Sequence, residues 1–516
     1  MGEFARNKRK YVTRRVKSYK LILNCSRFIT IYMEKQGLKN RALKGSFWSA
    51  ADAFLGYGVT FLVGIILARI LSPEEYGLIG IVLIFTSVLS GIVDSGFSNA
   101  LIRKKTVSNK DYNTMFIINM VMSFLLYILL WIFSPLIANF FLRPELTSIT
   151  RVMGLLLVFQ ALSIAQVTIL TKRIDFKTKT KASLIAALTS GTIGVVMAYL
   201  GYGVWSLVAQ QLSNKLVYSL CLFAFNKWWP EMVFSYESFR YMWGFGWKIM
   251  LSGILNNIWN QLYQVVVGKC YSPATLGQYS RSKEYAQLFS ANFTGILQRV
   301  TYPALSELQD DKVRMVSAYR RIIKISMFIT AISMTFLGAV SEPLLYCLIG
   351  PKWHEASTYL PLICISMSLY PIHAINLNML QVQGRSDIFL YLEIIKKIIS
   401  IVPLCLGIFA GIYWMLIGSI FTGVIAFFLN SYYTGKKLEY SSWMQIKDIT
   451  PSYAVALVIA IAVFFIKFLP LNYYLILAFQ VIVGFMVFFI VCESLKMKEY
   501  LEIKEIATAR INTLRK

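Results

Sequence analysis

Five amide side chains share one face of a single apolar segment. They are Asn256, Asn257, Asn260, Gln261 and Gln264. On a helical wheel they fall within an arc of roughly 140°, while leucine, isoleucine and valine fill the opposite side. Each amide can donate and accept hydrogen bonds, which suits a hydroxyl-rich ligand such as a sugar. Because amides are costly in lipid, we expect this face either to line a polar cavity or to bond to neighbouring helices.

Charged side chains also occur within the apolar segments. Lys215, Lys248 and Arg299 could attract a phosphate group, which arginine can bind through two parallel hydrogen bonds. A lysine near the end of a segment can instead reach the boundary between lipid and water. Asp52 lies inside the first segment, where we expect it either to bind a proton or sodium ion or to form an ion pair that fixes helix packing.

Three polar residues lie towards the end of the second apolar segment: Asp94, Asn99 and Arg103. Two roles fit them equally, a gate at that end or a structural cap. The sequence predicts neither a metal site nor an organic cofactor. Two histidines are too few for a metal cluster, the seven cysteines form no CxxC pair, and nucleotide-binding and hydrolase motifs are missing.

The composition is typical of a membrane protein. Of the 516 residues, 57% are hydrophobic and only 15% are charged, which is more apolar surface than a water-soluble protein can bury. The net charge of +27 is not read as nucleic-acid binding, because the basic residues form short clusters between apolar segments.

Fourteen segments are long and apolar enough to cross a bilayer, which requires about 20 residues. They are Phe47–Ile70, Gly77–Ile102, Met115–Leu142, Val152–Leu170, Leu184–Leu200, Val204–Phe225, Trp243–Val267, Tyr285–Tyr302, Ile322–Ile349, Tyr359–Leu380, Phe389–Ala410, Ile412–Tyr433, Tyr453–Leu469 and Leu471–Cys492. The predicted fold class is therefore an all-α integral membrane protein with about 14 transmembrane helices.

A repeat divides these segments into two halves. Ser72-Pro73-Glu74-Glu75-Tyr76-Gly77 and Ser272-Pro273-Ala274-Thr275-Leu276-Gly277 lie 200 residues apart, and we call them the two SPxxxG motifs. An even number of spans in each half makes two six-helix repeats parallel, as in transporters with a site between repeats. The predicted units are a basic tail (1–45), the first lobe (46–226), a linker (227–242), the second lobe (243–434), two additional spans (451–493) and a tail (494–516).

Basic clusters fall in alternate loops, around residues 103–110, 172–181, 312–321 and 436–437 and in the C-terminal tail. The other loops are short or acidic. Because positively charged loops stay in the cytoplasm, this pattern predicts a multi-pass protein with both termini cytoplasmic.

Several strings resemble the polysaccharide flippases of the Wzx type, in the branch that contains the colanic acid and teichuronic acid exporters. They are Leu67–Gly77, Arg173–Phe176, Gly203–Leu207, Leu276–Arg281 and Tyr302–Ser306. The resemblance covers about 34–492 and extends in fold to the MATE-like multidrug and oligosaccharide transporter superfamily. It implies transfer of an undecaprenyl-diphosphate-linked oligosaccharide from the cytoplasmic to the periplasmic leaflet of the bacterial inner membrane, without ATP and with an ion gradient as the driving force. It implies membrane lipids, a polysaccharide polymerase and chain-length machinery as partners.

We therefore expect alternating access between two six-helix lobes, with no catalysis. Lys248, Arg299 and Lys215 would meet the diphosphate, and the amide face would meet sugars. Two alternatives stay open: a cation-coupled multidrug antiporter of the same fold, and a membrane glycosyltransferase. An antiporter would be expected to have an aromatic, carboxylate-rich pocket, and a glycosyltransferase would usually have a large external loop.

The substitution Asp52→Asn tests the coupling role. It replaces an ionisable group by a neutral amide of similar size, so we expect transport to be abolished while the amount of protein in the membrane is unchanged. The measurement is transport of the lipid-linked oligosaccharide, normalised to protein by immunoblotting. Normal transport by this variant would rule out ion coupling through Asp52.

Overall fold

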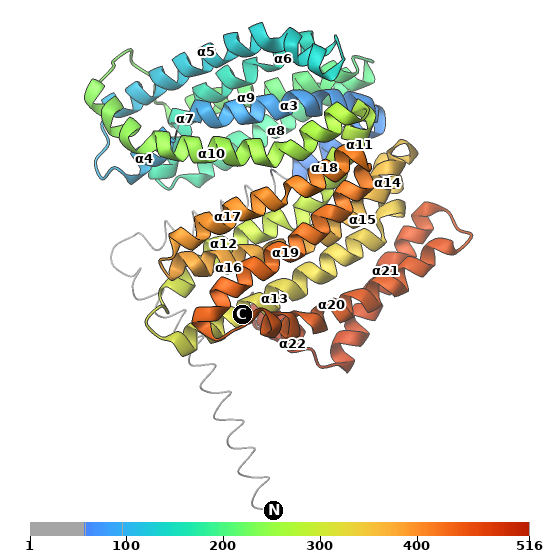
Figure 1. Cartoon of the computed structure of the whole chain (residues 1–516). Helices are drawn as coiled ribbons and strands as arrows, with labels where there is room; N and C mark the ends of the chain where they lie inside the picture. The colour runs from blue at the N-terminus through green and yellow to red at the C-terminus, as the bar shows by residue number, and fades with distance from the viewer. Residues whose placement is uncertain (1–55, 57, 95, 515–516) are drawn as a thin grey trace, which may run out of the picture.

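The chain is helical throughout the part that the structure describes. The structure, a computed structural model, describes residues 56, 58–94 and 96–514, and no strand occurs among them. Two helical bundles lie one above the other, with α3–α10 in the upper bundle and most of the later helices in the lower one (Figure 1). The predicted basic tail (1–45) and Asp52 lie outside the described residues.

The first repeat contains helix Gly58–Ile70, α3 (Pro73–Asp94), α4 (Phe97–Arg103), α5 (Asn109–Phe141), α6 (Leu146–Met153), α7 (Leu155–Lys172), α8 (Phe176–Tyr199) and α9 (Val204–Asn226). The second contains α10 (Tyr236–Cys270), α11 (Pro273–Phe289), α12 (Ala291–Ser306), α13 (Lys312–Ala339), α14 (Ser341–Ile349), η1 (Pro351–Trp353), α15 (His354–Ser368), α16 (Tyr370–Val382), α17 (Ser386–Ile399), α18 (Ile401–Phe409) and α19 (Ile412–Leu438). The chain continues with α20 (Ser442–Phe465), η2 (Ile466–Phe468), α21 (Tyr473–Ser494) and α22 (Lys498–Leu514).

Within the described ranges, nine helices are long and apolar enough to cross a membrane. This confirms the predicted class of all-α integral membrane protein. In their described residues, the remaining predicted spans are also helical but are shorter, interrupted or more polar, so the count of fourteen and the lobe boundaries stay predictions. The helix α11 begins at Pro273, twelve residues before the predicted span at Tyr285.

Both SPxxxG motifs form helix starts, as the proline and glycine spacing suggests. Ser72 and Glu75 form a capping box at the start of α3, in which Ser72 Oγ accepts from the Glu75 amide (3.3 Å) and Glu75 Oε2 accepts from the Ser72 amide (2.6 Å). At the start of α11, Ser272 Oγ accepts from the Thr275 amide at 3.1 Å. In each motif, a proline opens the helix, where its missing N–H is not needed.

The two motifs pack directly against each other. A Cβ atom built on Gly77 would lie 1.7 Å from the carbonyl oxygen of Pro273, and one built on Gly277 would lie 1.9 Å from that of Pro73. The contact is therefore reciprocal, because the glycine of each motif packs against the first turn of the helix that the other motif starts. Only a residue without a side chain allows two backbones to come this close.

Further contacts join the bundles at the same end of the molecule, which we call the motif end. The Arg69 Nε atom donates to the Leu348 carbonyl at 2.7 Å, and Lys352 Nζ donates to the Arg69 carbonyl at 2.8 Å. Trp353 is fully buried and donates from Nε1 to the Ala68 carbonyl at 2.8 Å. The two bundles thus meet at the motif end, to the right in Figure 1, and their ribbons separate towards the opposite end.

The substitutions Gly77→Ala and Gly277→Ala test the reciprocal contact. Each added methyl group would collide with a backbone carbonyl, which cannot move as a flexible side chain can. We expect each to lower the free energy of unfolding by about 1–3 kcal/mol, the range for overpacked sites. Chemical unfolding of the purified protein in detergent measures this.

Gly253→Ala is the matched control, because Gly253 lies within α10 and a Cβ there would meet no atom within 4 Å. Alanine favours a helix over glycine by about 0.5–1 kcal/mol, so this variant should be as stable as the wild type or slightly more stable. Equal stability of all three variants would contradict the close approach of the motifs.

Candidate functional site

The amide face of α10 divides between two environments. Gln261 Nε2 donates to Ser87 Oγ on α3 at 3.0 Å. Asn257 also faces α3, since its Nδ2 atom would lie 2.9 Å from a Cβ built on Gly91. Gln261 therefore binds helix to helix, which is one of the two roles that the sequence left open, and Asn257 lies at the same helix contact.

Two of the other amides lie on the exposed side of α10. Asn256 and Asn260 are exposed, and Gln264 is half-buried. Gln261 Oε1 is buried without a hydrogen-bond partner among the described residues. The exposed pair gives α10 a polar strip that can bond hydroxyl groups.

The three predicted phosphate-binding cations lie on three different helices. Lys215 is half-buried in the middle of α9, and Lys248 is exposed on α10, with its Nζ 6.0 Å from the centre of the Trp247 ring. Arg299 belongs to α12, but its side chain lies outside the described part. Of the two cations whose side chains are described, Lys215 and Lys248, neither contacts the other.

Of the three gate candidates, two have local contacts. Asp94 Oδ1 accepts from Ser98 Oγ at 2.6 Å, which links the end of α3 to the first turn of α4. Arg103 places its guanidinium 5.0 Å from the centre of the Phe245 ring on α10. Asn99 is exposed. Asp94 therefore makes a cap-like contact, while Arg103 faces the neighbouring helix.

A charged cluster that sequence reasoning missed lies inside α11. Arg281 is only 8% exposed, and its Nη1 atom pairs with Glu284 Oε2 at 2.6 Å. Its guanidinium carbon lies 4.0 Å from the centre of the Tyr76 ring on α3. The same Nη1 would be 3.5 Å from a Cβ built on Gly64, so a third helix approaches it as well.

This cluster can bind an anion between the repeats. A guanidinium has five N–H donors, and Arg281 Nε has no hydrogen-bond partner in the described part of the chain. Glu284 is 54% exposed, so the ion pair is buried at one end and open at the other. Lys283 is half-buried on the same helix but, two residues from Arg281, it faces another side of α11. Phosphate oxygens are the natural acceptors for such donors.

The repeat itself contains the signal that would have found this cluster. The 200-residue offset places Pro273 opposite Pro73, so the second segment of the second half should begin at Gly277, as the first-half segment begins at Gly77. Arg281 then falls opposite Ile81, well inside a span. The predicted span begins only at Tyr285, because the polar and charged residues 277–284 interrupt the apolar sequence.

Solved structures with a similar fold are membrane transporters. The lipid II flippase MurJ, in an inward closed conformation, matches with a TM-score of 0.68 at 16% identity, over 89% of this chain and all of that one. A multidrug resistance MATE family transporter in an inward-facing conformation matches with a TM-score of 0.58 at 16% identity, over 75% of this chain and 96% of that one. At these identities the likeness establishes the fold.

Curated relatives come from polysaccharide biosynthesis. The chain is 26% identical over 364 residues to the succinoglycan biosynthesis transport protein ExoT of Rhizobium meliloti (strain 1021), covering 70% of this chain and 74% of the relative. It is 22% identical over 411 residues to the lipopolysaccharide biosynthesis protein WzxC of Escherichia coli (strain K12), covering 79% and 84%. It is 22% identical to the teichuronic acid biosynthesis protein TuaB of Bacillus subtilis (strain 168), over 58% and 62%.

The family follows from a longer match. Residues 66–358, more than half of the chain, match the family described as polysaccharide biosynthesis protein. The match includes both SPxxxG motifs, the amide face and the Arg281 cluster, and with the MATE-type fold it confirms the resemblance drawn from the sequence. This multi-pass membrane protein belongs to the polysaccharide biosynthesis protein family.

Proposed function

We propose that the protein moves a lipid-linked oligosaccharide from one leaflet of the membrane to the other by alternating access, as a transporter and not as an enzyme. The support is its family, together with relatives named for the transport or biosynthesis of succinoglycan, lipopolysaccharide and teichuronic acid. The fold agrees, because it resembles that of a lipid II flippase.

One observation carries the mechanism: the two repeats close against each other at the motif end, and a buried arginine lies one turn behind that contact. Gly277 and Arg281 are four residues apart on α11, so both face the same neighbouring helices. A substrate head group at Arg281 would be separated from one side of the membrane by the packed motifs. Rocking the bundles about this contact would expose it to the other side.

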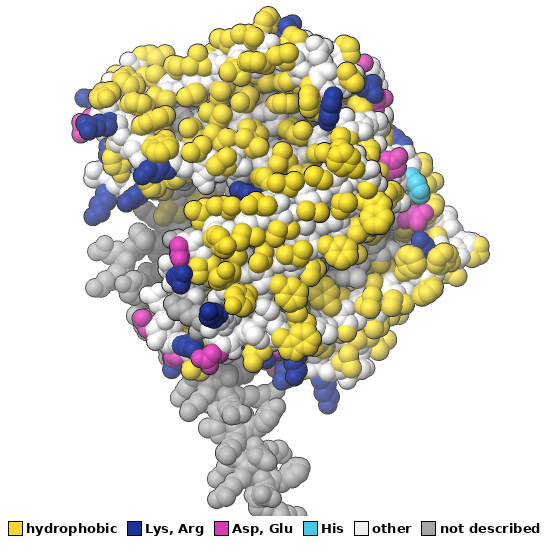
Figure 2. Space-filling view, viewed as in Figure 1, with side chains coloured by type: hydrophobic (Ala, Val, Ile, Leu, Met, Phe, Trp, Pro, Cys, Tyr) yellow, Lys and Arg dark blue, Asp and Glu magenta, His cyan; other side chains and the backbone are white. Residues whose placement is uncertain are grey.

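Each polar group has a distinct role in this proposal. Arg281, held by Glu284, binds the phosphate nearest the lipid, and Lys248, Lys215 and Arg299 attract it along the route. Asn256 and Asn260 bond sugar hydroxyl groups. The lipid chain stays outside in the bilayer, against surfaces where hydrophobic side chains dominate (Figure 2). A proton or sodium gradient, acting through Asp52, would drive the cycle.

The proposed setting is the bacterial inner membrane, with both termini in the cytoplasm. The positively charged loops support this orientation, because they would remain on the cytoplasmic side. The motif end would then face the periplasm, and transfer would run from the cytoplasmic leaflet outward. A polysaccharide polymerase and chain-length machinery would use the product.

Deletion and complementation in the native cell test the function. Loss of the protein should cause lipid-linked glycan to accumulate at the cytoplasmic face, measured by its resistance to a glycan-modifying enzyme added outside spheroplasts. Normal external glycan in the deletion strain would overturn the proposed function. If the protein conferred resistance to drugs while external glycan stayed normal in the deletion strain, the result would instead indicate the antiporter.

Within that assay, Arg281→Gln should lower flipping by roughly 10- to 100-fold, the effect of losing a hydrogen-bonded charge. Arg281→Lys should retain part of the activity, because it keeps the charge but not the forked donors. The control is Arg314→Gln, which breaks a similar i,i+3 pair with Asp311 (3.0 Å) on an exposed surface. Wild-type flipping by an Arg281→Gln protein present at normal amounts would remove Arg281 from the site.

A further inference from the structure

A cationic pocket lies between α4 and α10, at the end of α3 opposite the motifs. Its volume is about 330 Å³. Its lining consists of Ala100, Arg103, Lys104, Lys105, Tyr241, Gly244 and Phe245. Three of these residues are positively charged, two are aromatic, and no acidic residue lines the pocket among those that the structure describes. The pocket is therefore an anion site with aromatic walls.

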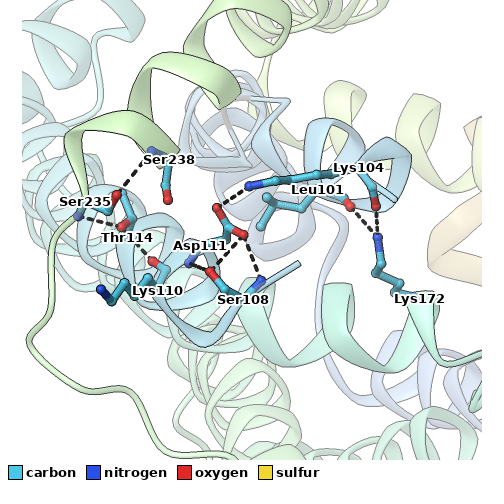
Figure 3. Close-up of polar contacts among 9 residues, drawn as sticks. All are labelled: Leu101, Lys104, Ser108, Lys110, Asp111, Thr114, Lys172, Ser235 and Ser238. Carbon is cyan, nitrogen blue, oxygen red and sulfur yellow. Dashed lines mark hydrogen bonds and ion pairs between the residues drawn. The ribbon is translucent and has the colours of Figure 1, made fainter. Parts of the chain in front are cut away.

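The cationic wall is fixed by a network behind it (Figure 3). Lys172, from α7, donates to the Leu101 carbonyl at 2.9 Å and also to the carbonyl of Lys104, so its ammonium caps the last turn of α4. On the far side of the loop, Ser108 and Asp111 form the capping box that starts α5. Both ends of the segment 104–108 are thus held in place.

The helix that forms the other wall is held equally closely. A Cβ built on Gly96, which precedes α4 and has a φ of 66°, would lie 2.6 Å from the carbonyl oxygen of Gly246 on α10. The two walls therefore cannot separate without breaking a backbone contact. A pocket with rigid walls loses little entropy when a ligand binds.

Two of the three positive charges are free to meet a ligand. Lys104 pairs with Asp111, which is almost fully buried, at 2.8 Å. Arg103 and Lys105 are exposed, and neither has a carboxylate within ion-pair distance among residues 56–514 that are described. A singly or doubly charged phosphate would balance them.

An exposed apolar stripe runs along α10 from the region of this pocket. It consists of Trp243, Trp247, Leu251 and Leu255, each about 40–55% exposed and four residues apart. Residues at this spacing lie on one face of a helix. Basic side chains at the end of an apolar helix, with tryptophan and tyrosine beside them, are typical of the membrane–water boundary.

We propose that this pocket binds the phosphate of an anionic phospholipid, whose acyl chain lies along the stripe on α10. The ligand reaches the pocket from the bilayer, and its headgroup fits a volume at the lower limit of small-molecule sites. An oligosaccharide would not fit there, so the site is distinct from the route at Arg281. Basic pockets between membrane helices recognise such headgroups. This site is independent of the proposed function.

Lipid titration of the full chain in detergent, followed by native mass spectrometry, tests the proposal. Phosphatidylglycerol should bind more tightly than phosphatidylcholine of the same chain length. The double substitution Arg103→Gln/Lys105→Gln should weaken phosphatidylglycerol binding by roughly 30-fold, because each cation near an anionic lipid contributes a factor of about five. Arg103→Lys/Lys105→Arg should restore it.

The matched control is Lys110→Gln/Lys181→Gln, which removes two exposed charges outside the pocket. It should leave lipid binding within about twofold of the wild type. Equal binding by the pocket variant and the control would overturn the proposal, provided that both unfold at the wild-type temperature. If 10 mM inorganic phosphate removed the lipid completely, the pocket would be a site for soluble phosphate, and the lipid assignment would also fall.

Discussion

The reciprocal approach of Gly77 and Gly277 is the contact on which the rest of the arrangement depends. Each glycine faces the first turn of the other repeat's helix, at a distance that no side chain permits. In a membrane, helices gain little from hydrophobic exclusion, so small residues that allow close backbone packing decide where helices cross. The capped starts of α3 and α11 direct both helices into this crossing, and Trp353 and Arg69 pack around it.

The crossing also explains how a charge is tolerated inside α11. Arg281 lies one turn beyond Gly277, where the near approach of α3 brings Tyr76 over its guanidinium and Glu284 completes an ion pair. A buried charge is stable only when it is paired in this way. The first repeat has Ile81 and Ile84 at the corresponding positions. The two halves therefore share a scaffold, while the charged group belongs to one of them.

Helix α10 connects the two ends of the molecule. In its C-terminal half, Gln261 bonds to α3 and Asn257 packs near Gly91 of that helix, and near its start Gly246 meets Gly96 before α4. Its exposed face presents polar amides and an apolar stripe side by side. A single helix thus borders the proposed route for a polar head group, the surface for a lipid chain, and a cationic pocket at the end remote from the motifs.

The sequence by itself determined the membrane class and the duplication, and the SPxxxG motifs carry the signals for the starts of α3 and α11. These depend on composition, on a fixed offset and on local capping, all of which are visible in one dimension. It also identified the amide face of α10, because helical periodicity decides which residues share a side. What each side contacts was not visible. Only the tertiary structure decided that Gln261 bonds to α3 and Asn257 faces it while Asn256 and Asn260 remain exposed, and that Arg281 joins Tyr76 across the repeats. Arg281 lay outside the predicted span, because a charged residue disfavours a membrane helix unless partners for the charge are known. Glu284 is only three residues away, but Tyr76 lies about 200 residues away in the chain, and the packing of the two glycines brings it over Arg281.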